Sequence, residues 1–295
     1  MSAPGRRYLL LVNPSAGGGR AKRALPGARR ALESRQVEHR VVMTTGLEHG
    51  CEQARAAVAA GEMVLVISGD GLIGQVGGVV AEAGGVLGVI PGGRGNDFAR
   101  VLGIPTEVEA AVEVIVAGEI RELDVGEVNG KRFLCIASCG FDSDANRIAN
   151  EAKRIRGQAV YLYAALRALV EWKPARFTLT LDGDRVEFTG YSVAAANSRA
   201  YGGGMFVAPA AELDDGLLDV VWTGPVGKLR FLANLPKVFK GTHVDEPEIS
   251  VRRASEVLIE ADRPFAVYAD GDHVADLPAT VRVLPGALRV IAPAG

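Results

Sequence analysis

The stretch from Val64 to Val76 (VLVISGDGLIGQV) ends an apolar run in a turn that places one acid between two glycines. Glycine permits positive φ or close backbone approach, so Gly69 and Gly71 can expose amide N–H groups where a helix begins, and such a turn binds anions. Asp70 is tolerable beside a phosphate only if it accepts a proton or if a cation lies between them. Both conditions indicate phosphoryl transfer.

A second glycine-rich loop (PGGRGND) follows the apolar run Val86 to Ile90 and ends in Asp97. Both runs lack charge, which is typical of strands buried on both faces of a parallel sheet. The carboxyl ends of such strands share one edge of the sheet, so we expect the two glycine loops to lie side by side there. Capping of a helix that begins at Phe98 would explain Asp97, but not the glycines before it.

The run from Gly69 to Gly74 also has the dinucleotide-binding spacing G-x-G-x-x-G. In dinucleotide-binding folds this turn follows the first strand, and an acid about 20 residues further on binds the ribose. Here the turn follows the third strand-like run and that acid is missing, so the match is weak.

The order of patterns predicts a parallel α/β domain followed by an antiparallel β domain with inserted helices. Strands are expected over residues 8–12 and 37–43, and helices over 49–60 and 107–117. Hairpin signals then appear at Asn129-Gly130 and Asp182-Gly183. Two more helices are expected, over residues 158–171 and from Pro225 to Lys240.

Composition excludes several classes of protein. The net charge of −2 over 295 residues gives no basic footprint, so we expect no nucleic acid partner. Three cysteines, with no secretory leader before them, fit a reducing cytoplasm, and Cys135 and Cys139 are expected as buried thiols. No apolar run approaches the roughly 18 residues of a membrane span, so any lipid must be reached from the membrane surface.

With these loops in place, the sequence resembles the diacylglycerol kinase catalytic family, the bacterial lipid kinases related to sphingosine and ceramide kinases. The likeness covers almost the whole chain. It rests on several motifs in the right order: Asn13-Pro14-Ser15, Ser68 to Gly71, Gly93 to Arg100, Leu123 to Gly126, Gly140-Phe141-Asp142, Gly202 to Gly204, Ala208-Pro209, Asp214 to Asp219 and Asp270-Gly271-Asp272.

The resemblance implies an NAD-kinase-like α/β nucleotide-binding domain over residues 1–125 and an antiparallel β-sandwich, lipid-binding domain with inserted helices over 126–285. The tail, about 286–295, is expected to return to the first domain. ATP and Mg²⁺ are the implied cofactors, and a lipid hydroxyl is the implied acceptor. We expect a cytoplasmic protein that touches the inner membrane face transiently, and a homodimer built on exposed edge strands is compatible with this fold.

The resemblance also assigns residues to the nucleotide and metal sites. Asp70, Asp97 and Asp124 match acids that form a water- and metal-linked cluster, in which Mg²⁺ would neutralise their mutual repulsion. Asp215 matches a structural Mg²⁺ site completed by the backbone carbonyls of Glu212 and Leu217, although a loop Asp before Gly is also common in ordinary turns. The implied nucleotide contacts are Asn13, Pro14, Ser15, Thr44 (or Thr45 in its place), Gly69, Asp70, Gly71, Leu72, Gly93, Arg94, Gly95, Asn96, Asp97 and Asp124.

The implied general base is Asp272, where the family usually has Glu, and Asp70 is the alternative base. Three further departures from the family pattern concern the nucleotide loops. Leu72 replaces a Thr, Gly74-Gln75 replaces Asn-Glu, and Arg94 replaces a Thr with a fixed cation. They leave three hypotheses: an ATP-dependent lipid kinase, a catalytically impaired paralogue that binds a nucleotide or lipid, and an NAD kinase.

Overall fold

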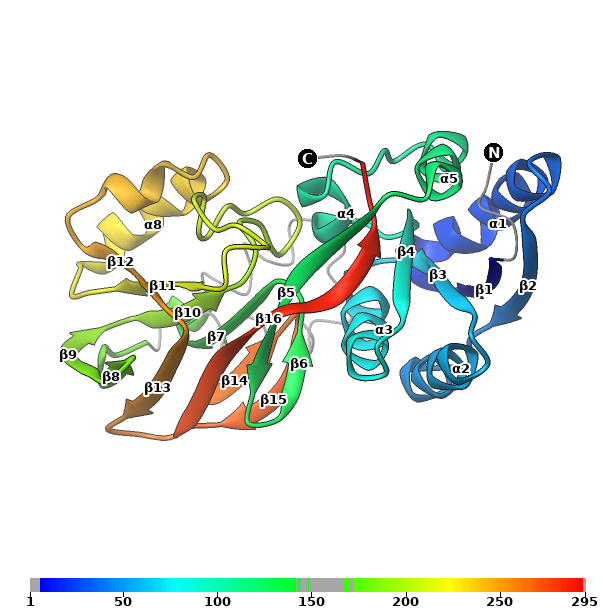
Figure 1. Cartoon of the computed structure of the whole chain (residues 1–295). Coiled ribbons are helices and arrows are strands. Elements are labelled where there is room, and N and C mark those ends of the chain that lie inside the picture. The colour runs from blue at the N-terminus through cyan, green and yellow to red at the C-terminus, as the bar shows by residue number, and fades with distance from the viewer. Residues whose placement is uncertain (1–5, 142, 144–147, 149–166, 170–171, 294–295) are drawn as a thin grey trace.

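The computed structural model describes residues 6–141, 143, 148, 167–169 and 172–293, and these form two lobes side by side (Figure 1). The first lobe is built on four parallel strands in the order β2–β1–β3–β4. Their bounds are β1 (Arg7–Val12), β2 (Glu38–Met43), β3 (Met63–Ser68) and β4 (Val86–Pro91). The predicted parallel domain is confirmed.

Helices cover both faces of this parallel sheet, as Figure 1 shows. The helices α1 (Ala16–Ser34) and α5 (Val108–Ala117) pack together on one face, and α2 (Leu47–Ala59) and α3 (Asp70–Glu82) pack together on the other. A short helix, α4 (Asp97–Val101), follows β4. Because both faces are covered, β4 is buried throughout and β3 from Val64 onward, which explains their uninterrupted apolar sequences.

Two long strands, β5 (Ile120–Val128) and β16 (Ala279–Ile291), run between the lobes. The end of β16 pairs in parallel with β4, from Arg289 opposite Val86 to Ile291 opposite Gly88. Its first residues pair antiparallel with β13 (Glu256–Ala261), and β5 pairs antiparallel with β16 from Val281 to Ile291. One ten-stranded sheet therefore continues from the first lobe into the second. Motif order did not predict this continuity.

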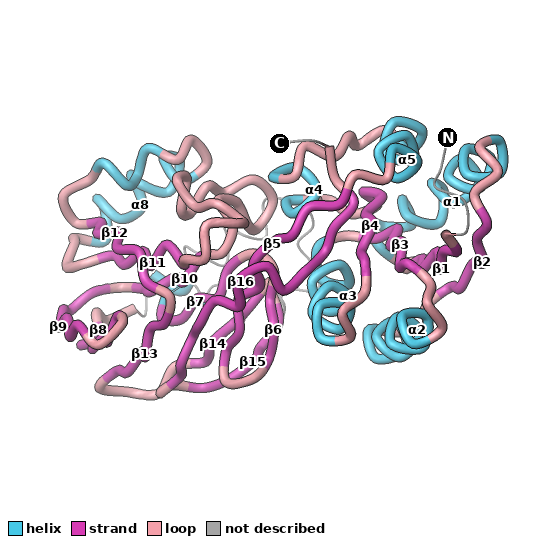
Figure 2. The backbone as a smooth tube through the Cα atoms, in the orientation of Figure 1, coloured by secondary structure: helices cyan, strands magenta, loops and turns pink. Residues whose placement is uncertain are grey.

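The second lobe is an antiparallel β-sandwich, as predicted. One layer continues the long sheet, and a separate six-stranded sheet has the order β12–β11–β10–β7–β14–β15. Figure 2 shows that strands make up most of this lobe. A core with many aromatic side chains lies between its two layers. The remaining strands are β6 (Lys131–Phe133), β7 (Ile136–Gly140), β8 (Ala175–Leu181), β9 (Asp184–Gly190), β10 (Ser192–Ala196), β11 (Leu218–Thr223), β12 (Ile249–Ala254), β14 (Ala266–Ala269) and β15 (Asp272–Asp276).

The predicted local signals are largely confirmed. Asn129-Gly130 and Asp182-Gly183 join β5 to β6 and β8 to β9, with positive φ at all four residues, as type I′ hairpins require. The helix expected from Pro225 begins at Lys228 as α8 (Lys228–Val238) and is followed by η1 (Thr242–Asp245). Most of the helix expected over 158–171 lies outside the described residues. Cys135 and Cys139 are buried thiols as expected.

No helix among the described residues has both the length and the apolar character needed to span a bilayer.

Candidate active site

The two glycine bends after β3 and β4 lie in backbone contact. A Cβ atom on Gly93 would lie 2.4 Å from the Cα of Gly69, so no larger residue fits there. The amide of Gly92 donates to the carbonyl of Ser68 at 2.8 Å, which extends the pairing of the two strands into the bends. The expectation that the two bends lie side by side is confirmed.

The loop after β1 joins the same sheet edge. Asn13 donates its amide to the carbonyl of Ile67 at 3.2 Å, and its Oδ1 accepts hydrogen bonds from the amide and hydroxyl of Ser15, at 3.1 and 2.8 Å. Pro14 lies between them. Gly17 has a φ of 59°, and a Cβ there would lie 2.5 Å from the carbonyl oxygen of Gly92. Three glycine- or Asn-containing loops thus meet at one edge of the sheet.

Thr44 and Leu72 are buried beneath this edge. The amide of Thr44 donates to the carbonyl of Val12 at 2.8 Å, and its side chain is only 5% exposed. Leu72 is packed against Gly50 of α2, where an added Cβ would lie 2.8 Å from Leu72 Cδ1. Leu72, which stands where the family has Thr, therefore packs between α2 and α3. Thr45 receives a different partner, because its amide donates to Nδ1 of His49 at 3.2 Å.

Asp70 and Asp97 form a close acidic pair around Gly95. A Cβ on Gly95 would lie 2.9 Å from Asp70 Oδ2 and 3.1 Å from Asp97 Oδ2, so a side chain there would displace both carboxylates. Oδ1 of Asp70 accepts a hydrogen bond from the amide of Phe98 at 3.3 Å. Burial, and then the charge of Asp97, raises the pKa of Asp70. The two carboxylates sit at the N-termini of α3 and α4, where a cation would relieve their repulsion.

The capping role suggested for Asp97 is wrong. The residue at the N-cap of α4 is Asn96, in the left-handed region, and Asp97 is the first helical residue. Its Oδ2 accepts a 2.6 Å hydrogen bond from the amide of Gly203 in the second lobe, and Oδ1 lies 3.4 Å from Nη1 of Arg100. The carboxylate therefore joins the two lobes instead of ending a helix.

The second lobe closes the site with a three-glycine loop, Gly202 to Gly204. Gly203 provides the amide to Asp97, and a Cβ on Gly204 would lie 2.8 Å from Arg100 Nη1. Arg100 also donates to the carbonyl of Gly95 at 3.0 Å. The sequence contained the signal, three successive glycines, but gave no reason to place it opposite the first domain.

Both carboxylate oxygens of Asp124 accept hydrogen bonds from backbone amides. Its Oδ2 accepts the amide of Gly216 at 2.7 Å, and its Oδ1 accepts the amide of Gly286 at 2.8 Å. Within the described ranges, no three His, Cys, Asp or Glu side chains are grouped so that they could hold a metal ion. The water- and metal-linked cluster of Asp70, Asp97 and Asp124 stays a prediction. The carboxylate of Asp124 ties together two loops where the lobes join.

Asp215 has one buried carboxylate oxygen without a hydrogen-bond partner among the described residues. Its Oδ1 accepts the amide of Leu217 at 3.0 Å, while its buried Oδ2 accepts no hydrogen bond from the described residues. Nη1 of Arg253 lies 3.5 Å from that Oδ2. Glu212 is exposed, so its side chain does not enclose the site. An unsatisfied carboxylate oxygen fits a hard cation, although the guanidinium already offsets part of its charge.

Asp272 and Asp270 lie on either side of Gly271 at the turn between β14 and β15. Nε2 of Gln75 donates to Oδ2 of Asp272 at 3.1 Å, which links this turn to α3. Asp270 accepts three backbone amides, at 2.7, 2.9 and 3.1 Å, and an added Cβ on Gly74 would lie 2.9 Å from its Oδ2. The donors are Leu134, Cys135 and Ile136.

Asp270 is a site residue that sequence reasoning named only as part of a motif. Burial raises its pKa to about 6, against the three amides, which lower it. Two of the α3 residues that depart from the family pattern face this turn, since Gly74 makes room for Asp270 and Gln75 binds Asp272. Arg94, by contrast, is exposed on its loop and makes no hydrogen bond or ion pair with any residue that the structure describes. It does not fill the space between the glycine bends.

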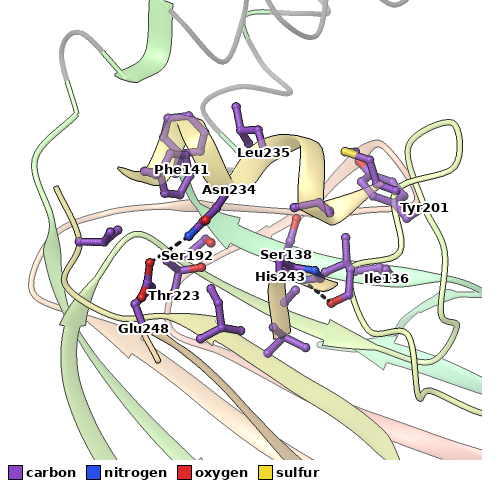
Figure 3. A pocket seen from close by; sticks show the side chains of 18 residues that line it. Ile136, Ser138, Phe141, Ser192, Tyr201, Thr223, Asn234, Leu235, His243 and Glu248 are labelled. Carbon is purple, nitrogen blue, oxygen red and sulfur yellow. Dashed lines mark hydrogen bonds between the residues drawn. The ribbon is translucent and has the colours of Figure 1, made fainter. Parts of the chain in front are cut away.

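A mainly apolar pocket of roughly 170 Å³ lies in the second lobe, between the six-stranded sheet and α8 (Figure 3). Strand residues such as Ile136 and Ala194 line one side, and Phe231 and Leu235 of α8 line another. His243, 5% exposed, contributes a ring whose Nε2 meets the carbonyl oxygen of Val207 at 3.1 Å and whose Nδ1 has no hydrogen-bond partner among the described residues. A long apolar chain would match such a lining.

Comparisons with known proteins agree with this two-lobed architecture. The sequence model of the diacylglycerol kinase catalytic domain matches residues 7–128, and that of the YegS C-terminal NAD kinase beta sandwich-like domain matches residues 135–292. The fold and its loop-lined site thus define a two-domain kinase of the lipid kinase class. The chain belongs to the diacylglycerol kinase catalytic family.

Similar proteins come from several bacteria. A diacylglycerol kinase of Mycobacterium tuberculosis is 37% identical over 96% of this chain and 94% of its own. A probable YegS-like lipid kinase of Pseudomonas aeruginosa is 33% identical over 98% and 95%. A solved structure from Bacillus anthracis has a TM-score of 0.84 at 24% identity and covers 99% of this chain and 98% of its own, which shows the shared fold.

Proposed function

We propose that this protein is an ATP- and Mg²⁺-dependent lipid kinase that phosphorylates a hydroxyl of diacylglycerol or a related long-chain lipid. The observation that carries the proposal is the acidic pair Asp70 and Asp97, held where three glycine- or Asn-containing loops meet at one sheet edge. The names of the Mycobacterium tuberculosis and Bacillus subtilis relatives, both diacylglycerol kinases, support it.

The loops after β1, β3 and β4 would hold the nucleotide phosphates, because glycines let a ligand approach the backbone closely. The amides of Gly92 and Gly93 already donate to Ser68 and Asn96, so other amides of these loops would contact the phosphates. Arg94 would add a cation that can bind phosphate bidentately. Asp70 and Asp97 are the residues that fit a nucleotide-bound Mg²⁺. Hydrogen bonds hold both carboxylates in place, and the raised pKa of Asp70 shows that its ionised form is disfavoured unless a cation lies nearby. When bound, Mg²⁺ supplies neutralisation of the charge that develops on the phosphates.

Asp272 would accept the proton of the lipid hydroxyl as that oxygen bonds to the γ-phosphorus and the bond to the β-phosphate oxygen breaks. The Gln75 amide donates to Oδ2 of this carboxylate at 3.1 Å and so fixes its orientation. Asp70, whose pKa is raised above its usual value by burial and by the charge of Asp97, is the alternative base.

The acceptor's acyl chain would occupy the pocket beneath α8, which is open and mainly apolar. Such a substrate resides in a membrane, so the protein would act at the bilayer surface. Asp215, with its unsatisfied Oδ2, would hold a structural Mg²⁺ together with the carbonyls of Glu212 and Leu217.

The test is phosphorylation of a panel of long-chain lipids by purified protein with radiolabelled ATP and Mg²⁺. We expect labelled lipid, a loss of about 100-fold or more in Asp70→Asn and a smaller loss in Asp272→Asn. Absence of product with every lipid would overturn the proposal. NAD offered as acceptor distinguishes an NAD kinase. Nucleotide binding by calorimetry without turnover, with turnover restored in Arg94→Thr, would identify a non-catalytic paralogue instead.

A further inference from the structure

The helix α8 presents two different faces. Its inner side chains, among them Phe231, Asn234 and Leu235, line the apolar pocket (Figure 3). Leu229, in its first turn, is 85% exposed, more than any other large hydrophobic residue that the structure describes, and Phe239, just after the helix, is 49% exposed. In Figure 1, α8 lies on the outside of the second lobe, above β11 and β12. The helix therefore exposes a large apolar side chain near each of its two ends.

The charge on this helix departs from that of the whole chain. Residues 228–240 hold four cations and no acid, whereas the full sequence has a net charge of −2. Two acids do face the helix from the segment after η1. Their side chains are 20% exposed for Glu246 and 8% for Glu248, while those of Arg230 and Lys237 are 56% and 40% exposed. The acids therefore lie beneath the cations, and the cations form the outer surface. The four cations are Lys228, Arg230, Lys237 and Lys240.

We propose that α8 docks the protein on an anionic phospholipid bilayer. Leu229 and Phe239 enter the boundary between headgroups and acyl chains, and the cations contact the lipid phosphates, as in interfacial amphipathic helices. Because the inner face of the same helix lines the pocket, an acyl chain passes from the bilayer to the pocket along α8 without crossing water. The docking rests on exposed apolar area and charge. The passage of the chain rests on the proposed function.

The test is co-sedimentation of the full chain with vesicles of phosphatidylcholine, with and without phosphatidylglycerol. We expect binding that requires phosphatidylglycerol and weakens as salt is added. The double variant Leu229→Ser and Phe239→Ser should bind about tenfold more weakly, and the pair Lys228→Gln and Lys240→Gln should lose the dependence on phosphatidylglycerol. The matched control is Leu47→Ser, because Leu47 is 43% exposed on α2 of the other lobe. It should bind as the unaltered protein does.

Equal vesicle binding by the Leu229 and Phe239 double variant would overturn the docking proposal. So would a dimer, seen by light scattering, that this variant abolishes while vesicle binding is unchanged, since that result assigns the surface to a second copy of the chain. Phosphorylation of detergent-dispersed lipid separates the two proposals. If the unaltered protein binds vesicles but phosphorylates no lipid, the kinase proposal fails and the docking proposal stands. If the Leu229 and Phe239 double variant is fully active on detergent-dispersed lipid but inactive on vesicles, both proposals are supported.

Discussion

The side-chain amide of Gln75 donates a hydrogen bond to Oδ2 of Asp272 across the junction of the two lobes, at 3.1 Å. Both residues depart from the family pattern, Gln75 on α3 and Asp272 on β15, and their side chains are in contact. A Glu at position 75 would place a second negative charge against the shorter Asp. The uncharged amide removes that repulsion and orients the carboxylate, so the two exchanges are physically complementary.

This contact predicts a graded loss of activity at position 75. Gln75→Met keeps the length of the side chain but donates nothing, and we expect kcat to fall about tenfold. Gln75→Glu repels Asp272, and misplacement of a reacting group by about 1 Å costs on the order of 100-fold in kcat. The KM for ATP should not change in either variant. Steady-state kinetics with both substrates measure this, and unchanged kcat in Gln75→Glu would remove Asp272 as the base.

Asp270 should make stability depend on pH. Its folded pKa is about 6, above the usual 3.8, so the folded state favours the protonated acid. The contribution of Asp270 to the free energy of unfolding is fully present below about pH 4. It decreases by about 3 kcal/mol as the pH rises through about 6. We expect the denaturation midpoint of the unaltered protein to decrease relative to that of Asp270→Asn as the pH is raised from 4 to 6.5. Parallel curves for the two proteins over this range would contradict the prediction.

The contact of the two glycine bends predicts a position that tolerates no side chain. Gly93→Ala places a Cβ 2.4 Å from the backbone of Gly69, which must separate the bends. We expect lower thermal stability, by about 2 kcal/mol or more, and loss of nucleotide binding. The control is Gly46→Ala, where nothing lies within 4 Å of the added atom and the backbone is extended. A wild-type melting temperature in Gly93→Ala would show that the bends move apart freely.

The pocket predicts that added volume there affects lipid but not nucleotide. Ala194 is 3% exposed and lines the pocket from β10, so Ala194→Phe extends into the space that an acyl chain would need. We expect KM for the lipid to rise about tenfold or more, with ATP affinity by calorimetry unchanged. An equal KM for long-chain lipid in both proteins would place the acyl chain elsewhere.

Asp215 predicts a response to magnesium. If its buried Oδ2 binds the cation, millimolar Mg²⁺ should raise the melting temperature of the unaltered protein by a few degrees, and a chelator should reverse the shift. Asp215→Asn should melt at the same temperature with and without Mg²⁺. Equal shifts in both proteins would leave Arg253, 3.5 Å from the carboxylate, as the sole balance of its charge.

Sequence alone determined the first lobe and the floor of its site. Charge-free runs and glycine turns are local signals. Buried parallel strands have their carboxyl ends at one edge of a sheet, so the contact between Gly69 and Gly93 was predictable. The tertiary structure decided the contacts between lobes, such as Gly203 to Asp97 and Gln75 to Asp272. These depend on where β16 returns to β4. The resemblance implied that the tail returns to the first domain, but pairing between residues just over 200 positions apart leaves no periodic signal that would give its place or register. Burial, which also depends on the tertiary structure, raised the pKa of Asp270, and the folding of two distant loops onto Asp124 gave that acid its hydrogen bonds to Gly216 and Gly286.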